Sequence, residues 1–258
     1  STSSSSETML NNTTSIHSQY CEYWYINSVC NKWKAYVKGD YESGFPFAIS
    51  SKAGYKIIYQ PFFTRQFPFL GIHDSQFMSS VISLMKQEYR WIRINLPFAF
   101  NELTTKSNLL NFQSLNLSAE YSLIYDNYST NAKRILKKTG GFKLVKSNDI
   151  DGFIEFFNQE VGLKIGLVDE NYKCLKLLIT NGLSNHKIQL YSIEKKGAFL
   201  GFVCFYFHEN IINYLKGALN EDGKKLGGMY FAFDQIIQQY AGKDCIFDFG
   251  GSNLKGIS

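Results

Sequence analysis

One order of strands occurs twice along the chain, and this repeat constrains the fold more than any other feature of the sequence. In each half, three short β-rich runs separated by turn residues are typical of an antiparallel meander. The sequence therefore predicts two similar sheets. The runs of the first half are 33–37, 41–49 and 55–59, and those of the second half are 188–193, 198–207 and 211–215.

The similarity continues beyond each meander, because apolar residues at helical spacing follow the third run and a further strand comes next. In the first half, 33 positions separate Tyr59 from Ile92. The same 33 positions separate Tyr214 from Phe247 in the second half, where the helix is predicted at 226–240. We therefore expect an α/β (α+β) fold of two tandem β-β-β-α-β units, each with a mixed, mostly antiparallel sheet flanked by helices.

The predicted units also give the domain boundaries, since a chain of 258 residues is long enough for two medium-sized domains. Residues 1–15 are predicted to form a flexible N-terminus, 16–128 the first domain and 129–258 the second. Apolar residues alternate with polar ones over 114–125, which predicts a half-buried strand that closes the first domain.

A basic helix is predicted at 131–139 as the connector between the two domains. Ser129 or Thr130 can cap its N-terminus, and Gly140 with Gly141 can end it. Six cations with no acid between them begin in this helix. A solvated helix face and a contact for the phosphates of a cofactor, an RNA or an anionic polymer both explain such a run. The cations are Lys133, Arg134, Lys137, Lys138, Lys143 and Lys146.

Composition excludes several classes of protein. The 45% share of hydrophobic residues and the 19% share of charged residues exclude an intrinsically disordered chain. The five cysteines form no CxxC pair and have no histidine at metal-ligand spacing, so we expect reduced thiols in a cytoplasmic protein and no metal. The longest apolar run, 197–207, is far shorter than the ~20 residues of a membrane-spanning helix.

This order of elements resembles the GNAT acyltransferase fold, and two tandem copies resemble the Fem-type peptidyltransferases and their bacterial relatives. The stretch YDNYSTNAKRILKKT at 125–139 is similar to the entry to the second domain in such proteins. The stretch FDFGGSNLKGIS at 247–258 is similar to the strand and turn near their C-terminus. The resemblance also implies one or two strands after the fifth. We expect these C-terminal strands to be missing, with the sheet edge trimmed, disordered or supplied by a neighbouring molecule.

The resemblance implies a donor site at the start of the helix that follows the fourth strand. GNAT enzymes bind the pyrophosphate of acyl-coenzyme A there, with the signature Arg/Gln-x-x-Gly-x-Gly/Ala. Met229 stands where that signature has a small residue, and an ordinary glycine-bearing turn is the alternative. The first copy has Pro61 and Pro68 at the equivalent place, which lack N–H donors, so we expect a donor only in the second. The implied donor-binding residues are Lys224, Lys225, Leu226, Gly227 and Gly228.

Three side chains are candidates for catalysis. Asp248 lies between two phenylalanines and is suited to accept a proton from an attacking amine. Alternatively, its carboxylate fixes the turn at 250–252 through backbone hydrogen bonds. Tyr214 and Tyr230 are candidates for an acid or for a contact to a carbonyl, although tyrosines on strands more often contribute to packing.

These features favour an acyltransferase that moves an acyl group from acyl-coenzyme A to an amine or hydroxyl acceptor. The first alternative is a Fem-type transferase that moves an aminoacyl group from tRNA to a cell-wall precursor. In that case Lys133, Arg134, Lys137 and Lys138 supply the phosphate contacts. The second alternative is a non-catalytic binding module on a degenerate GNAT scaffold. A resemblance at the level of the fold does not choose among them.

Overall fold

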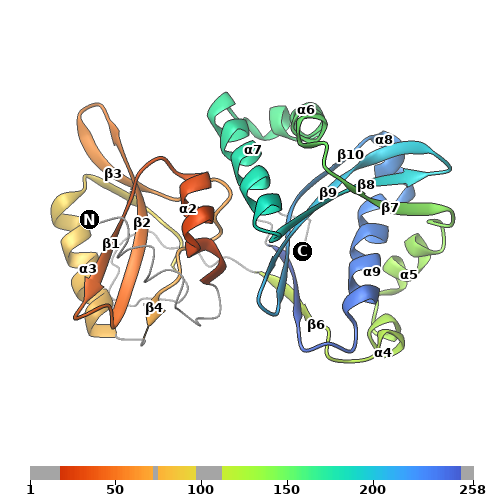
Figure 1. Cartoon of the computed structure of the whole chain (residues 1–258), viewed down its shortest axis with the longest axis horizontal. Helices are drawn as coiled ribbons and strands as arrows, with labels where there is room; N and C mark the ends of the chain where they lie inside the picture. Colours follow the sequence, from red (N-terminus) through yellow and green to blue (C-terminus); the bar gives the residue numbers. More distant parts are fainter. Residues whose placement is uncertain (1–17, 72–74, 97–111, 251–258) are drawn as a thin grey trace. The chain divides into compact units, whose positions relative to one another are not determined.

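The computed structural model describes residues 18–71, 75–96 and 112–250. Residue contacts divide the chain into two compact units, Ser1–Leu109 and Leu110–Ser258 (Figure 1). The predicted flexible N-terminus, 1–15, lies outside the described residues, as does the last part of the C-terminal stretch. No helix in the described ranges is both long enough and apolar enough to cross a membrane.

The first unit contains a meander of three antiparallel strands followed by a helix and a parallel strand. Its sheet has the order β1-β2-β3-β5, in which β3 and β5 run parallel, while β4 pairs with β2. The elements are η1 (Ser18–Cys21), α2 (Tyr23–Val29), β1 (Trp33–Lys38), β2 (Ser43–Lys52), β3 (Tyr55–Tyr59), β4 (Leu70–Gly71), α3 (Ser75–Glu88) and β5 (Trp91–Arg93).

Helix α3 provides much of the core of the first unit. Its apolar residues recur at helical spacing, so that Met78, Val81 and Met85 fall on one face and are all buried. These side chains belong to one core cluster with Phe47 of β2 and Ile58 of β3. One face of the first sheet is therefore closed by α3.

The second unit has a six-stranded sheet in the order β6-β11-β10-β9-β8-β7. Its elements are β6 (Gln113–Asn116), α4 (Tyr121–Asp126), α5 (Thr130–Leu136), β7 (Phe142–Ser147), α6 (Ile150–Glu160), η2 (Gly162–Ile165), α7 (Asp169–Ser184), β8 (Ile188–Lys195), β9 (Ala198–His208), β10 (Ile211–Leu219), α8 (Glu221–Leu226), α9 (Gly228–Tyr240) and β11 (Ile246–Gly250).

Helices cover both faces of this sheet (Figure 1). Alternate residues of β9 point to opposite faces. Phe205 packs with Phe233 of α9 at a centroid distance of 6.3 Å, whereas Phe202 packs with Phe153 of α6 at 5.8 Å. Helix α9 therefore covers one face, and α6 with α7 covers the other.

The predicted duplication is confirmed. In both units the meander is antiparallel, a helix follows its third strand, and the next strand pairs in parallel with that third strand. Ile58 pairs with Ile92 in the first sheet, and Ile212 pairs with Phe247 in the second. The segment that connects the two paired strands therefore differs in length by only one residue between the two copies.

The prediction of one strand over 114–125 is wrong. Only 113–116 form a strand, and the chain then turns into the helix α4. Tyr121, Ile124 and Tyr128 are three and four positions apart, so this stretch satisfies the helical period as well as the alternating one. Strand β6 belongs to the second sheet, so the predicted boundary between residues 128 and 129 falls inside the second unit.

Strand β6 also corrects the prediction about the sheet edge. It pairs antiparallel with β11, with Leu115 opposite Phe247. The edge beside β11 is therefore occupied by a strand that precedes the second copy of the repeat in the sequence.

The basic helix is present as α5, which begins where predicted because the Ser129 side chain accepts a hydrogen bond from the N–H of Ala132. It ends at Leu136, before the two glycines, where the Thr139 hydroxyl donates to the Leu136 carbonyl. It lies within the second unit, so the prediction of a connector between the domains is wrong. It contacts α9 instead.

Candidate active site

The parallel ladder between β10 and β11 is short. Its last paired residues are Asn213 and Asp248, yet β10 continues to Leu219. The two strands are thus hydrogen-bonded at one end of β10 only. Two polar side chains are buried at this point of the sheet, since Asn213 is 3% exposed and Asp248 is 6% exposed.

A β-bulge follows directly after the end of this ladder. The register between β9 and β10 shifts between Tyr214 and Lys216, which makes Leu215 the extra residue. A bulge turns the strand, changes which residues face each side and is frequent next to active sites. Tyr214 and Gly217 are three positions apart, and a regular strand would turn them to opposite faces. Because of the bulge, both face α9.

The structure separates two of the predicted catalytic residues. Asn213 and Asp248 are register partners in a parallel pair, so their side chains lie on the same face. Phe247 belongs to the core beneath α9, which places Asp248 on the opposite face, covered by α6 and α7. Tyr214 points toward α9, with its ring 5.0 Å from that of Phe233. Asp248 is therefore brought together with Asn213 and not with Tyr214.

Asp248 also stabilises the end of β11. The N–H of Gly250 donates a hydrogen bond of 2.9 Å to Oδ1 of Asp248. Gly250 has a φ of +84°, a conformation that glycine adopts without steric cost. This contact is the turn-fixing role that the sequence offered as the alternative, and residues 251 and 252 of that turn lie outside the described part.

The two candidate tyrosines differ in their environments. Burial raises the pKa of Tyr214, the neighbouring Cys204 raises it further, and the backbone of Gly217 acts in the opposite direction. Its phenol is therefore neutral at pH 7 and can donate a hydrogen bond, but it cannot serve as a base. Tyr230 lies in the first turn of α9 and is 44% exposed.

Gly227 joins two helices, because it ends α8 and is the N-cap residue of α9. Its φ of +80° lies in the left-handed region, and its N–H donates to the carbonyls of Gly223 and Lys224. This N–H is therefore already paired within the protein and does not point to a ligand. The physical reason is α8 itself, whose last carbonyls need donors.

The start of α9 still presents backbone donors. Phe231 is the first residue whose N–H reaches an acceptor of this helix, the carbonyl of Gly227 at 3.1 Å. No side chain caps the helix, so the N–H groups of Gly228, Met229 and Tyr230 have no intrahelical partner. Met229 departs from the GNAT signature, and its Cε lies 2.8 Å from where a Cβ on Gly217 would stand. Its side chain fills the space between α9 and β10.

The lysines before Gly227 have different surroundings. Nζ of Lys224 lies 2.7 Å from Glu160 and 2.9 Å from Glu221, and hydrogen bonds to these two carboxylates raise the pKa of the lysine. Its charge is thus compensated within the protein. Lys225 is exposed in the last turn of α8, one residue before Leu226, the final residue of that helix.

Helix α5 packs against the start of α9 through Ile135. A Cβ on Gly227 would lie 2.1 Å from Cγ2 of Ile135, so Ile135 covers this glycine directly. Lys133 donates to the Asp126 carbonyl at 2.8 Å, whereas Lys137 and Lys138 follow the last turn of α5 and are exposed. Arg134 is also exposed and donates to Asn131 within the same helix.

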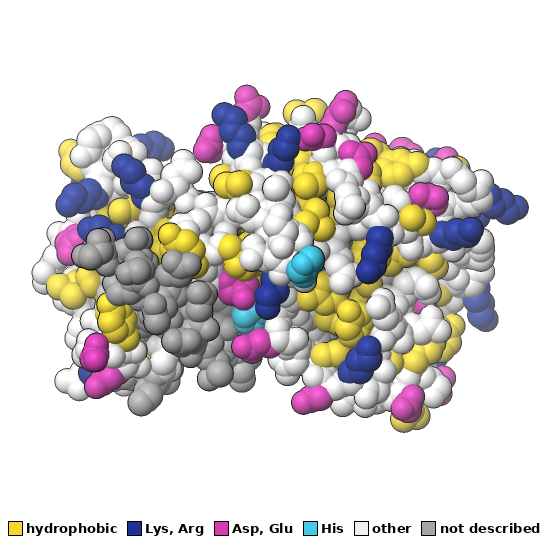
Figure 2. Space-filling view, viewed as in Figure 1, with side chains coloured by type: hydrophobic (Ala, Val, Ile, Leu, Met, Phe, Trp, Pro, Cys, Tyr) yellow, Lys and Arg dark blue, Asp and Glu magenta, His cyan; other side chains and the backbone are white. Residues whose placement is uncertain are grey.

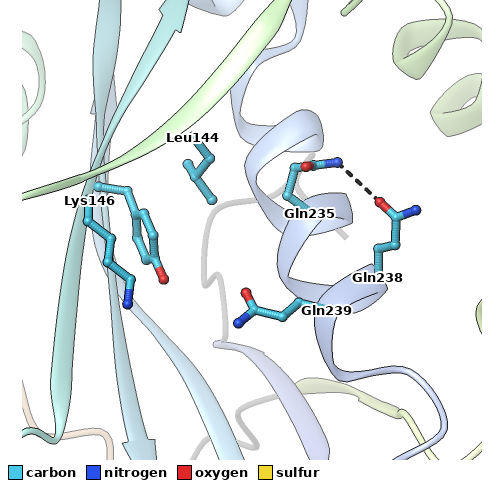
Figure 3. A pocket seen from close by; sticks show the side chains of 6 residues that line it. Leu144, Lys146, Gln235, Gln238 and Gln239 are labelled. Atoms are coloured by element: carbon cyan, nitrogen blue, oxygen red, sulfur yellow. Dashed lines mark hydrogen bonds between the residues drawn. The ribbon is translucent and has the colours of Figure 1, made fainter.

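A separate groove of about 400 Å³ lies between β7, β8 and the later turns of α9 (Figure 3). Burial, with a smaller effect from Tyr240, raises the pKa of Tyr191 in this groove to about 12. None of the predicted catalytic or donor-binding residues lines it. No group of three or more metal-ligating His, Cys, Asp or Glu side chains occurs within 18–71, 75–96 and 112–250. The residues that line the groove are Leu144, Lys146, Tyr191, Gln235, Gln238 and Gln239.

No protein-family model matches the sequence, and no curated protein matches it either. Solved structures do match. FemX superposes with a TM-score of 0.63 at 10% identity, over 99% of this chain and 89% of FemX. The chain has the tandem GNAT-like fold of FemX.

Two further structures share the FemX-like fold over most of this chain. The C-terminal domain of a putative lysylphosphatidylglycerol synthetase from Agrobacterium fabrum has a TM-score of 0.52 at 10% identity, over 98% of this chain and 78% of its own. L-PGS from Bacillus licheniformis has a TM-score of 0.50 at 10% identity, over 99% of this chain and 78% of L-PGS.

Within this FemX-like fold, sequence reasoning missed two residues that shape the candidate site. Asn213 is buried beside Asp248, and Ile135 covers Gly227. An asparagine within a run of apolar strand residues was a visible signal for the first. Nothing in the sequence indicated the second, because the contact joins residues that are 92 positions apart.

Proposed function

We propose that the second unit is an acyltransferase, which binds an acyl donor at the start of α9 and transfers the acyl group to an amine or hydroxyl acceptor. The observation that carries the proposal is the arrangement of β10. Its ladder with β11 stops at Asn213, a bulge follows, and the uncapped end of α9 lies beyond it. Within the described residues, no strand pairs with this edge of β10 beyond Asn213.

The start of α9 is suited to an anionic part of the donor. Three backbone N–H groups without intrahelical partners and the positive end of the helix dipole favour a negative charge by about 0.3–1 kcal/mol. Lys225 and Lys138 are exposed cations near this end. Acyl-coenzyme A, with its pyrophosphate, supplies such an anion.

The reacting groups that we propose lie along the same strands. An acceptor amine must lose a proton as it attacks the donor carbonyl, and Asp248 is the proposed base. Tyr214 keeps its proton because burial raises its pKa, so it is the proposed hydrogen-bond donor to the carbonyl or the leaving group. Because the two side chains face opposite sides of the sheet, the acceptor and the donor would approach from different sides.

Aminoacyl-tRNA is a second candidate donor, and the position of α5 favours it. Ile135 covers Gly227, and the N–H of that glycine is already used by α8, which leaves less room for a pyrophosphate than the GNAT signature implies. Lys137 and Lys138 directly follow α5 and are exposed, and they are the proposed contacts to the phosphates of an RNA.

Calorimetric titration of the full chain with acetyl-coenzyme A tests the first candidate, and titration with aminoacyl-tRNA tests the second. We expect Lys225→Gln to weaken binding of the donor, with Lys173→Gln on α7 as a control because Lys173 is also exposed and lies on another helix. Release of free thiol from acetyl-coenzyme A with primary amines then measures transfer. If neither donor binds, the chain is a binding module without acyl transfer.

A further inference from the structure

One face of the first sheet carries exposed side chains near the turn that joins β2 and β3. Ser50, Ile57 and Trp91 are register partners on three neighbouring strands, so they point to the same side. Lys52 and Tyr55 form the next pair on this side. The core residues of β2 and β3 that pack against α3 lie at the positions between them, so this side faces away from α3.

Two large aromatic rings stand exposed on this face. Tyr55 is 54% exposed and Trp91 is 51% exposed. Their ring centroids are 5.9 Å apart at an interplanar angle of 72°, so they form one continuous aromatic surface. Contiguous exposed apolar surface, unlike apolar residues scattered singly, is typical of surfaces that contact a partner.

Two cations share the face of the aromatic pair. Arg93 is two residues after Trp91 and shares its face, and Lys52 lies opposite Tyr55. In the described residues between 43 and 96 the only acid is Glu88. Figure 2 shows Lys and Arg side chains over the part of this unit where the β2–β3 hairpin stands. The cations of this stretch are Lys52, Lys56, Arg65, Lys86, Arg90 and Arg93.

We propose that this face binds single-stranded nucleic acid, with bases stacked on Trp91 and Tyr55 and phosphates on Lys52 and Arg93. Exposed rings on a sheet surface accept the unpaired bases of a single strand, whereas the bases of a duplex are already stacked on one another. The basic surroundings complement the phosphate backbone. This binding goes beyond the proposed acyl transfer, because it uses the first unit and involves no group of the candidate active site.

Fluorescence anisotropy of the full chain with a labelled oligouridylate of about twelve nucleotides tests the stacking. We expect Trp91→Ala to weaken binding roughly 5- to 150-fold, the range found when a stacking ring is removed. Trp91→Phe keeps a ring and should retain most of the affinity, which separates stacking from any loss of structure. Phe62→Ala is the matched control, because Phe62 is 48% exposed in the same unit and lies outside this face.

The salt dependence tests the phosphate contacts. Lys52→Gln and Arg93→Gln should each lower the slope of log K against log salt concentration by about 0.7. Lys173→Gln should leave the slope unchanged. The proposal is overturned if the oligouridylate does not bind at about 50 mM salt, or if Trp91→Ala binds as tightly as the parent chain. It is also overturned if duplex RNA or a sulfated polysaccharide binds as tightly as the single strand, because charge alone would then explain the binding.

Discussion

Replacing Gly227 by alanine tests the packing of α5 on the start of α9. Gly227 has a φ of +80° and a ψ of 35°, and a residue with a Cβ adopts this left-handed conformation at a cost of about 1–2 kcal/mol. The added Cβ would also lie 2.1 Å from Cγ2 of Ile135. Overpacking of this kind costs about 1–3 kcal/mol. We therefore expect Gly227→Ala to lower the free energy of unfolding of the second unit by about 2–5 kcal/mol.

A double variant separates the two contributions. Ile135→Ala removes Cγ2, and the remaining Cβ of residue 135 lies 3.7 Å from the new methyl group, an ordinary contact. In this background Gly227→Ala should cost only the conformational part, about 1–2 kcal/mol. Gly140→Ala is the control, because no atom lies within 4 Å of its added Cβ.

Urea unfolding followed by far-UV circular dichroism measures these free energies. The three tryptophans, Trp24, Trp33 and Trp91, all lie in the first unit, so their fluorescence reports on that unit alone. Hydrogen exchange of peptides from β10 and α9 locates the effect in the second unit. If Gly227→Ala costs the same with isoleucine and with alanine at position 135, the contact between α5 and Gly227 does not exist as described.

Three further variants probe the second unit. Burial raises the pKa of Asp234, so its protonated form favours folding; the resulting stability is present below the ordinary Asp pKa of about 4 and is lost as pH rises through the raised value. Asp234→Asn, which keeps an acceptor for Tyr121, should flatten this dependence in thermal unfolding from pH 4 upward. Ser129→Ala removes the cap that accepts from Ala132 and should cost about 1 kcal/mol in urea unfolding. Met229→Ala restores the small residue of the GNAT signature and should tighten binding of acetyl-coenzyme A in calorimetry, whereas unchanged affinity would show that Met229 does not limit the donor.

The repeated units could be predicted from the sequence because their signals are local. Each strand of the meander has its own turn residues, and the apolar residues of α9 recur at helical spacing over 228–240. Strand β6 had no such signal, since a run of four residues with one apolar side chain fits many structures. Its place beside β11 depends on pairing Leu115 with Phe247, which are far apart in the sequence.

The residues of the candidate site could be named from the sequence, but their geometry could not be predicted. The glycines before α9 and the aspartate in β11 are visible in the sequence alone. The face to which each side chain of β10 points could not be predicted from the sequence, because the bulge at Leu215 changes the alternation along this strand. Likewise, the ion pair of Lys224 with Glu160 joins residues that are far apart in the sequence, so it could not be predicted from the sequence.

Hydrogen exchange with and without donor tests the central proposal of a donor site at the start of α9. Peptides that cover 226–231 contain the three N–H groups that α9 does not use itself. We expect these peptides, with those that cover 213–217 of β10, to exchange more slowly in saturating acetyl-coenzyme A or aminoacyl-tRNA. Slower exchange confined to other parts of the chain, or no change with either donor, would contradict the proposal.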